Sequence, residues 1–451
     1  VNDGLAIRTY LGRGDGSFAP GKAYASNDSV GYLSATDLNG DGHIDLYVGL
    51  GNGGFFGGDQ FGVDQAYALL GNGDGSFRGA PAFGFVHTGR NLADLDGDGR
   101  LDAVGVNADV SFTSHLGDGR GGFTPAATLA VASVRLGSET FTVREIESFA
   151  LADINGDGKP DLLFFGKDFV GRNSTSEFFS RGLLVALGDG RGGFAAPSFI
   201  PAPSLVPAGD VPVDLALANL VAADVNGDGK ADLVYSYRIT ALFADTLSVG
   251  TAVQLGRGDG TFAAPRTLVF HSGPSRTPFT LTSQVQQLAD LNRDGRPDLI
   301  LVTQTPTVSP LGGFISKIQV ALATAQGDGT FDAPADVAGP EQLVRQGAGE
   351  APAPIVVSDF DGDDIPDLIA LGGGSNGLQL AVMPGKGDGS FKAPLRKDLG
   401  GQYLNSQQQI AVADFDGDGK ADVLLADAFS GRSGIYLGAG GGSVLTQGTA
   451  G

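Results

Sequence analysis

Short apolar runs, separated by glycine-rich and acidic turns, recur along the whole chain. Residues 46–50 (LYVGL), 162–165 (LLFF), 299–302 (LILV) and 368–371 (LIAL) are the clearest of these runs. Uninterrupted runs of this length, bounded by turn residues, are typical of strands that are buried on both faces. Shorter apolar stretches lie before and after each run, and helical periodicity is nowhere sustained. The pattern predicts an all-β chain built from short antiparallel strands.

An acidic nonapeptide immediately precedes these runs and recurs along the chain. It carries carboxylate or amide side chains at positions 1, 3, 5 and 9, as in DLNGDGHID. Its copies, here called the first to the seventh loop, occupy residues 37–45, 94–102, 153–161, 224–232, 290–298, 359–367 and 414–422. A glycine-rich turn alternates with it and ends at Phe18, Phe77, Phe123, Phe194, Phe262, Phe331 and Phe391. A worn copy of this turn occupies residues 438–444.

Each unit reads as four strands: one before the acidic loop, one after it, one before the glycine-rich turn and one beginning at its phenylalanine. This predicts a seven-bladed β-propeller of four-stranded antiparallel blades, with the acidic loops between strands one and two. The whole chain, 1–451, is then a single propeller domain. Residues 1–29 are a half unit that closes the ring, 30–446 are seven repeat units, and 447–451 are a tail. We expect the N-terminal strands to share one blade with the C-terminal strands, which hides the sheet edges.

Composition and charge exclude several classes of function. The chain has 29 Lys and Arg against 51 Asp and Glu, a formal net charge of −22. Such an acidic surface repels phosphate backbones, so nucleic acid is excluded as a partner. No apolar run approaches the roughly 18–20 residues of a membrane helix, so we expect no membrane insertion. Cysteine is absent, which excludes disulfides and thiolate metal sites.

These repeats resemble the FG-GAP/VCBS repeats, the family that includes the integrin alpha-subunit propeller and many bacterial surface proteins. The acidic loops, interleaved with the glycine-rich turns, carry the resemblance over nearly the whole chain. The resemblance implies a calcium-binding β-propeller. In integrin-like relatives the face opposite the calcium loops binds the ligand.

The residue types of the acidic loops also point to calcium. Calcium takes six to eight oxygen ligands at about 2.3–2.6 Å. Side chains at positions 1, 3, 5 and 9, with a backbone carbonyl at position 7, can surround one ion. The predicted ligands of about seven sites are Asp37, Asn39, Asp41, His43, Asp45, Asp94, Asp96, Asp98, Arg100, Asp102, Asp153, Asn155, Asp157, Lys159, Asp161, Asp224, Asn226, Asp228, Lys230, Asp232, Asp290, Asn292, Asp294, Arg296, Asp298, Asp359, Asp361, Asp363, Ile365, Asp367, Asp414, Asp416, Asp418, Lys420 and Asp422.

Two loops depart from the common pattern. The fifth has Arg293 at position 4, where the other loops have glycine, and the sixth has Asp364 at position 6. Because these positions favour a left-handed backbone, we expect the sixth loop to be the weakest calcium site. The alternative is a set of acidic β-turns without metal. We expect calcium affinities of roughly 10⁻⁴–10⁻³ M, as in extracellular modules. Such sites fill outside cells, which favours a secreted or cell-surface protein, and the resemblance to bacterial surface proteins implies a bacterial source.

Binding residues are expected on the face opposite the calcium loops. Four long segments, 51–64, 166–182, 236–250 and 303–317, gather aromatic and arginine side chains there, which are common in binding hot spots. Phe56, Arg172, Phe179 and Arg238 are the candidates for ligand contact. Alternatively, the aromatic side chains only pack within their own loops.

The sequence thus favours a monomeric, calcium-stabilised extracellular binding or adhesion module whose ligand is a glycan or a protein. The four histidines lie apart, and no hydrolase or nucleotide-binding motif occurs, so no catalytic residue is predicted. Two alternatives stay open. One is a polysaccharide lyase or hydrolase on a propeller scaffold, and the other is a structural spacer of a larger surface protein.

Overall fold

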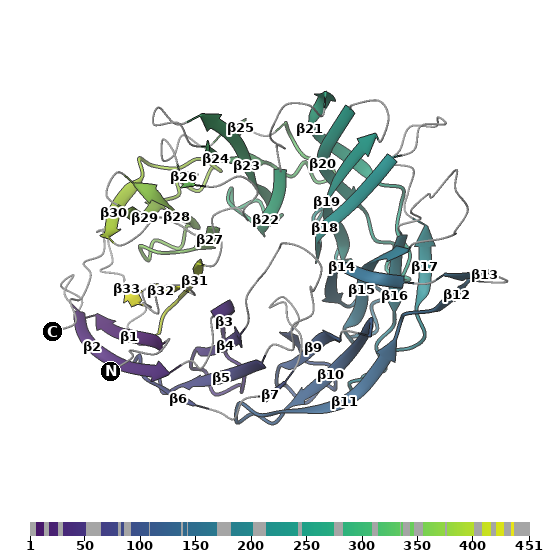
Figure 1. The fold of residues 1–451 in the computed structure, drawn as a ribbon, viewed down its shortest axis with the longest axis horizontal. Helices are drawn as coiled ribbons and strands as arrows, with labels where there is room; N and C mark the ends of the chain where they lie inside the picture. Colours follow the sequence, from purple (N-terminus) through teal and green to yellow (C-terminus); the bar gives the residue numbers. More distant parts are fainter. Residues whose placement is uncertain are drawn as a thin grey trace.

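A computed structural model gives the fold of the chain (Figure 1). It describes residues 6–12, 18–25, 30–50, 65–79, 83–84, 92–107, 109–136, 139–141, 143–168, 182–201, 213–241, 246–274, 283–308, 314–333, 335–336, 343–346, 355–374, 377–400, 408–415, 421–427 and 434–436. Within these residues every regular element is a β-strand, which confirms the all-β prediction. Nor do the described residues include a helix long and apolar enough to span a membrane.

The strands form a series of antiparallel sheets in chain order. The first two strands, β1 (Ala6–Gly12) and β2 (Phe18–Ala25), pair with each other. The next sheet contains β3 (Val30–Thr36), β4 (Asp45–Leu50), β5 (Gln65–Gly71), β6 (Phe77–Gly79) and β7 (Phe83–Gly84). It is followed by β8 (Leu92–Ala93), β9 (Asp102–Asn107), β10 (Ser111–Gly117) and β11 (Phe123–Ala130), and by a small hairpin of β12 (Val134–Leu136) and β13 (Glu139–Phe141).

The middle of the chain forms two more four-stranded sheets. One contains β14 (Val143–Ala152), β15 (Asp161–Asp168), β16 (Gly182–Ala186) and β17 (Ser198–Pro201). The other contains β18 (Val213–Ala223), β19 (Asp232–Ala241), β20 (Thr246–Gln254) and β21 (Arg266–Pro274).

Three sheets complete the chain. The first has β22 (Ser283–Ala289), β23 (Asp298–Val308), β24 (Phe314–Ala323), β25 (Ala335–Asp336) and β26 (Leu343–Gln346). The second has β27 (Ile355–Ser358), β28 (Asp367–Gly374), β29 (Gly377–Met383) and β30 (Leu395–Gly400). The third has β31 (Gln408–Ala413), β32 (Asp422–Asp427) and β33 (Gly434–Tyr436).

The sheets stand side by side in a ring, with strands such as β14, β18, β22 and β27 facing its middle (Figure 1). Each described hydrophobic cluster joins two sheets that neighbour each other around the ring. In β15, Leu162 and Phe164 pack toward the preceding sheet, whereas Leu163 and Phe165 pack toward the following one. This alternation explains why the apolar runs are uninterrupted, because both faces of the strand are buried. The architecture is a β-propeller.

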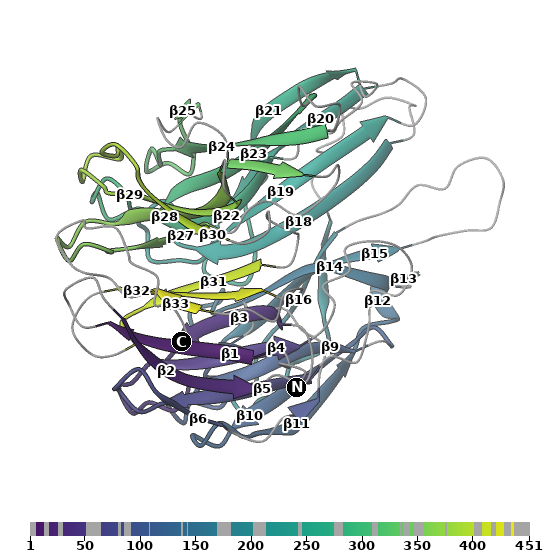
Figure 2. The ribbon, with the colours of Figure 1, turned by 60° about the vertical axis from the view of Figure 1, so that its left-hand side comes forward.

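The ring closes by packing between the first and the last complete units. Leu33, Leu46 and Phe77 of the β3–β7 sheet share one cluster with Phe415 and Leu424 of the last unit. The N-terminal hairpin also lies here, because β1 contacts β33 (Figures 1 and 2). Within the described strands, however, no hydrogen-bonded ladder joins β1 to the β31–β33 sheet. The two chain ends therefore lie in contact, but the described strands do not pair them into the one shared blade that the sequence predicts.

The predicted blade pattern needs correction. Instead of seven equal four-stranded blades, the described strands give four sheets of four strands, two of five, one of three and two hairpins. The two additional strands have a local cause: β6 and β7 each pair a different part of β5, and β25 and β26 each pair a different part of β24. The outer strand of these sheets is thus split in two, which the repeated motifs alone do not reveal.

Two segments predicted as long loops are largely strand. Segment 236–250 contains the ends of β19 and β20, and segment 303–317 contains those of β23 and β24. In segment 236–250 alternate side chains still enter the core: Tyr237 and Ile239 are buried, whereas Arg238 is exposed. Hydrophobic alternation of this kind extends a hairpin beyond the short apolar run.

Candidate metal centre

Each acidic loop connects the first strand of a sheet to the second, as the sequence predicts. In the first loop, Asp37 directly follows β3, and Asp45 begins β4. The same placement holds in the other sheets, where the last aspartate of the loop is the first residue of β9, β15, β19, β23, β28 or β32. Residues 416–420 of the seventh loop, including Asp416, Asp418 and Lys420, lie outside the described residues.

The aspartate at position 9 is fully buried and connects three parts of its sheet. Asp45 accepts the N–H of Leu38 at position 2 (2.9 Å) and the N–H of Gly71 at the end of β5 (2.7 Å). The same pair of bonds recurs for Asp102, Asp161, Asp232, Asp298 and Asp367. All position-9 aspartates are at most 2% exposed. They clamp the loop to the third strand, a role that sequence reasoning did not assign to them.

Burial shifts the titration of these carboxyl groups upward. Desolvation raises the pKa of Asp45 to about 6, against the hydrogen bonds from Gly71 and Leu38, which lower it. Desolvation also raises the pKa values of Asp102, Asp161, Asp232, Asp298 and Asp367. The cause is the cost of holding a charge away from water, with neighbouring carboxylates of the same loop adding to it. A cation beside these groups would relieve both effects.

The aspartate at position 1 organises the loop backbone. Oδ1 of Asp153 accepts the N–H groups of Gly156 (2.7 Å) and Asp157 (3.2 Å), and its Oδ2 accepts that of Gly158 (2.7 Å). Gly156 and Gly158 have φ of 76° and 79°, in the left-handed region. Glycine enters this region without the steric cost of a Cβ atom, which explains glycine at positions 4 and 6.

The two irregular loops keep the same backbone. Arg293 has φ of 63° and Asp364 has φ of 61°, so both residues occupy the left-handed region in place of glycine. Asp364 still donates its N–H to Oδ2 of Asp359 at 2.8 Å. The sequence departures therefore add local strain. The sixth loop keeps the bonds to its position-1 aspartate, but it lacks the bond from the position-5 N–H to the position-3 side chain that the first five loops make.

The aspartate at position 5 is exposed and lies beside a basic side chain in the second to sixth loops. Arg100, at position 7 of the second loop, lies 3.0 Å from Asp98, and the third, fourth and fifth loops repeat this pairing at 3.9, 3.2 and 3.7 Å. The sixth loop has Ile365 at position 7, and there Lys392 lies 3.5 Å from Asp363 instead. Lys392 follows Phe391 in the sequence, so only the folded hairpin brings it to the loop. Such exposed pairs contribute little stability by themselves.

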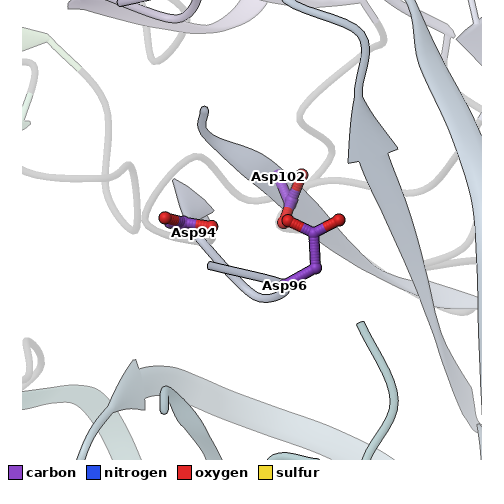
Figure 3. Close-up of side chains that lie close together, drawn as sticks. All are labelled: Asp94, Asp96 and Asp102. Carbon is purple, nitrogen blue, oxygen red and sulfur yellow. The ribbon is translucent and has the colours of Figure 1, made fainter. Parts of the chain in front are cut away.

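Carboxylates at positions 1, 3 and 9 converge. Oxygens of Asp94, Asp96 and Asp102 lie within 4.8 Å of one another in the second loop (Figure 3). Asp359, Asp361 and Asp367 form the same arrangement in the sixth loop. Both loops have aspartate at position 3, whereas the first, third, fourth and fifth loops have asparagine there. The predicted position-5 ligands Asp98 and Asp363 are outside these groups.

One oxygen in the sixth loop is buried without a hydrogen-bond donor. Oδ1 of Asp361 has almost no exposed surface and no partner. Desolvation, and then the charge of Asp363, raise the pKa of Asp361. A buried oxygen of this kind needs either a proton or a cation. The donor set of the loop, hard oxygens from positions 1, 3 and 9, suits calcium.

The predicted ligand-contact residues are only partly placed. Phe56, Arg172 and Phe179 lie outside the described residues, as do segment 51–64 and most of segment 166–182. Arg238 is exposed on β19, between the buried side chains of Tyr237 and Ile239. Tyr237 and Ile239 belong to the core between two sheets, so in this segment the aromatic side chain packs inside the protein.

Fold and loops together define a β-propeller whose repeated unit carries an acidic strand-to-strand loop. An FG-GAP-like repeat model matches the chain four times, at residues 37–105, 94–164, 290–370 and 359–425. Each match begins at the first aspartate of one loop and extends beyond the last aspartate of the next. The matches span more than half of the chain, so this chain belongs to the FG-GAP-like repeat family, as the sequence predicted.

Several solved structures are similar to this chain at low sequence identity, and the first of them supports the propeller fold. An Agrocybe aegerita lectin, described as specifically recognising non-reducing terminal N-acetylglucosamine, is 18% identical, with a TM-score of 0.53 over 95% of this chain and 96% of the lectin. An α-L-arabinofuranosidase of Fusarium graminearum is 10% identical, with a TM-score of 0.44 over 96% of each chain. Sqt1 of Chaetomium thermophilum is 11% identical, with a TM-score of 0.43 over 98% of this chain and 99% of Sqt1. A comparison with curated protein sequences finds no match.

Proposed function

We propose that the acidic loops bind calcium and that the ions hold the strands of each sheet together. The unpartnered Oδ1 of Asp361 beside Asp359 and Asp367 is the observation that carries this proposal. The clamped aspartates at position 9 remain able to bind an ion, because each carboxylate oxygen has two lone pairs and one N–H occupies only one of them. A bound ion would supply positive charge where the first and second strands meet, and no catalytic step is assigned to it.

Calcium titration tests this proposal directly. Calorimetry on the chelator-treated chain should show several binding events, and calcium should raise the melting temperature because it binds the folded state. Asp361→Ala removes a side-chain ligand of the sixth loop and should reduce the number of bound ions, whereas Asp361→Asn restores the asparagine of the first, third, fourth and fifth loops and should keep the site. Asp388→Ala is the matched control, since Asp388 is an exposed aspartate in the glycine-rich turn of the same sheet. No calcium binding and an unchanged melting temperature would contradict the proposal.

We further propose that the propeller is an extracellular binding module for a glycan, rather than an enzyme. The likeness to the Agrocybe aegerita lectin supports a scaffold suited to carbohydrate recognition. Sites that bind calcium with the modest affinity of extracellular modules would be filled outside cells, which favours secretion or a cell-surface location. Arg238, exposed on β19 between the buried side chains of Tyr237 and Ile239, is the described candidate for ligand contact.

A glycan array, probed with and without calcium, tests this second proposal. Binding that needs calcium would link the loops to recognition. The affinity for any glycan found is then measured for the Arg238→Ala variant, which should bind more weakly. Arg191→Ala is the control, because Arg191 is an exposed arginine in a glycine-rich turn. Turnover of an acidic polysaccharide would instead favour the enzyme alternative, and an array without any hit would favour a protein ligand or a structural spacer.

A further inference from the structure

Three acidic loops contain the chemically labile pair Asn-Gly at positions 3 and 4. The pairs are Asn39-Gly40 in the first loop, Asn155-Gly156 in the third and Asn226-Gly227 in the fourth. The three glycines are exposed to solvent, with φ between 73° and 77°. Asparagine is a thermolabile residue, and a following glycine leaves the next backbone nitrogen unhindered because it has no Cβ atom.

We propose that Asn39, Asn155 and Asn226 are sites of spontaneous deamidation, and that the aspartate at position 1 of each loop controls the rate. In the third loop, the backbone nitrogen of Gly156 would attack Cγ of Asn155. The N–Cγ bond forms, the bond from Cγ to Nδ2 breaks, and ammonia leaves with the proton of the Gly156 amide. Water then opens the cyclic imide to aspartate or isoaspartate. Overall, the side-chain amide and one water molecule are converted to a carboxylate and an ammonium ion.

The loop restrains the nitrogen that must attack. Gly156 donates its N–H to Oδ1 of Asp153 at 2.7 Å, and Gly40 and Gly227 make the same bond to Asp37 and Asp224 at 2.8 and 2.7 Å. Cyclisation requires this nitrogen to lose its proton, and the resulting negative charge beside a carboxylate is unfavourable.

The asparagine side chain is restrained as well. Oδ1 of Asn155 accepts the N–H of Asp157 at 2.9 Å, and Asn39 and Asn226 accept the corresponding bonds at 2.8 and 3.0 Å. These bonds fix the direction of the side-chain amide. The folded loop therefore slows a reaction that its own sequence favours.

The fifth loop is a control within the same chain. Its asparagine, Asn292, also accepts a bond from position 5, Asp294, at 3.0 Å. The next residue is Arg293, whose side chain crowds the backbone nitrogen, so this loop should react slowly. The second and sixth loops already carry aspartate at position 3, namely Asp96 and Asp361.

Deamidation would change the charge and the backbone of the loop in which it occurs. Each event adds one negative charge to a cluster that already holds three aspartates, and the aspartate product gives the third loop the side-chain set of the second. The isoaspartate product instead lengthens the backbone between positions 1 and 9. The inference itself rests on the hydrogen bonds of the loops and stands whether or not they bind calcium.

Peptide mapping by mass spectrometry tests the proposal on the full chain. The protein is kept in mildly alkaline buffer at physiological temperature, and peptides are followed for the mass gain of replacing NH by O. We expect slow conversion at Asn39, Asn155 and Asn226, faster conversion of all three in urea, and little at Asn292. No conversion at the three sites in the folded chain, or equal rates in folded and unfolded chains, would overturn the proposal.

Two variants separate the roles of sequence and restraint. Asp153→Ala removes the acceptor of the Gly156, Asp157 and Gly158 N–H groups. Conversion at Asn155 should become at least about tenfold faster, which is the effect of losing the one hydrogen bond to Gly156 from a charged group. Asn39 and Asn226 in the same molecule report whether the fold is intact. Asp157→Ala, which removes no acceptor from Gly156, is the matched control.

Arg293→Gly makes the complementary test by installing Asn-Gly in the fifth loop, where Asn292 should begin to react. An unchanged rate at Asn155 in Asp153→Ala, or a parallel rise at all three asparagines, would overturn the role of the position-1 aspartate. An unreactive Asn292 in Arg293→Gly would overturn the assignment to the Asn-Gly pair.

Discussion

The N–H of Gly75 donates a 2.9 Å hydrogen bond to the carbonyl oxygen of Phe415. Gly75 lies in the glycine-rich turn between β5 and β6, whereas Phe415 is position 2 of the seventh loop, near the other end of the chain. The bond therefore joins the two ends of the ring. The N–H of Phe415 is itself held by Asp422, so the acidic loop and the neighbouring turn meet through one residue.

The same connection recurs around the ring. Gly192, Gly260 and Gly389 donate to the position-2 carbonyl oxygens of Leu95, Ile154 and Leu291, at 3.2–3.3 Å. In each case the glycine-rich turn of one sheet contacts the acidic loop of the preceding sheet. The glycine-rich turn and the acidic loop therefore depend on each other, because together they form the contact between neighbouring sheets.

Phe415→Ala should destabilise ring closure. Phe415 is 4% exposed, and its ring lies edge-on to Phe77 with centroids 6.1 Å apart. Loss of a buried phenylalanine costs about 3–5 kcal/mol of unfolding free energy. Denaturant titration of Phe415→Ala measures this cost, and Phe415→Leu, which keeps most of the buried volume, should lose much less. Equal stability of the alanine variant and the parent would show that the ring does not depend on this contact.

Asp161→Ala should lower the stability of the folded chain far more than Asp157→Ala does. Asp161 is fully buried and accepts the N–H groups of Ile154 and Gly188. Its removal leaves one buried and one half-buried donor unpaired, at up to about 1–3 kcal/mol of unfolding free energy each. Asp157 is exposed; its side chain accepts the N–H of Lys159 at 3.0 Å and lies 3.9 Å from the Lys159 ammonium, and such an exposed ion pair contributes at most about 1 kcal/mol. Thermal melts of both variants with chelator present isolate the effect of the clamp from that of calcium. Similar losses in the two variants would contradict this assignment.

Arg293→Gly should raise stability modestly. Arg293 holds φ of 63°, and a left-handed backbone costs a non-glycine residue roughly 1–2 kcal/mol. Part of the gain is lost because glycine makes the unfolded chain more flexible, by about 0.4–1 kcal/mol. A net gain of up to about 1 kcal/mol is expected from chemical denaturation. Arg296→Gly, at a position with no left-handed backbone, should instead lose stability.

Much of this architecture could be predicted from the sequence, and the remainder depends on contacts between units. The apolar runs predicted strands buried on both faces, and Leu162 to Phe165 show how alternate side chains fill two different cores. The acidic loops were predicted to lie between the first two strands of each sheet, which β3 and β4 confirm.

Other features needed the folded chain. The split outer strands beside β5 and β24 follow from irregular segments that carry no repeated motif. In the sixth loop Lys392 takes the place of the basic residue at position 7, and its ion pair with Asp363 joins residues that are distant in sequence. The clamp role of Asp45 depends on Gly71, at the end of a strand that only folding brings to the loop. Spacing within a motif reveals a local loop, but not which distant amide its carboxylate holds.

The stability of the metal-free chain should fall as the pH rises from about 4 to about 6. Burial raises the pKa of Asp45 from 3.8 to about 6, so in this window the folded state holds a proton that the unfolded state has lost. Each rise in pH then removes stability, until the group is ionised in both states. The other position-9 aspartates with raised pKa values act in the same direction.

Denaturant titration across this window, with chelator present, measures the slope. Asp45→Asn removes one titrating group and should flatten it. Asp41→Asn is the opposing control: the hydrogen bond from the His43 backbone lowers the pKa of Asp41, so its contribution is present at neutral pH and disappears as the pH falls. Calcium, which binds the ionised carboxylates, should reverse the trend by stabilising the folded state most at the higher pH. A metal-free chain that gains stability from pH 4 to pH 6 would show that the position-9 carboxyl groups do not carry raised pKa values in the folded protein.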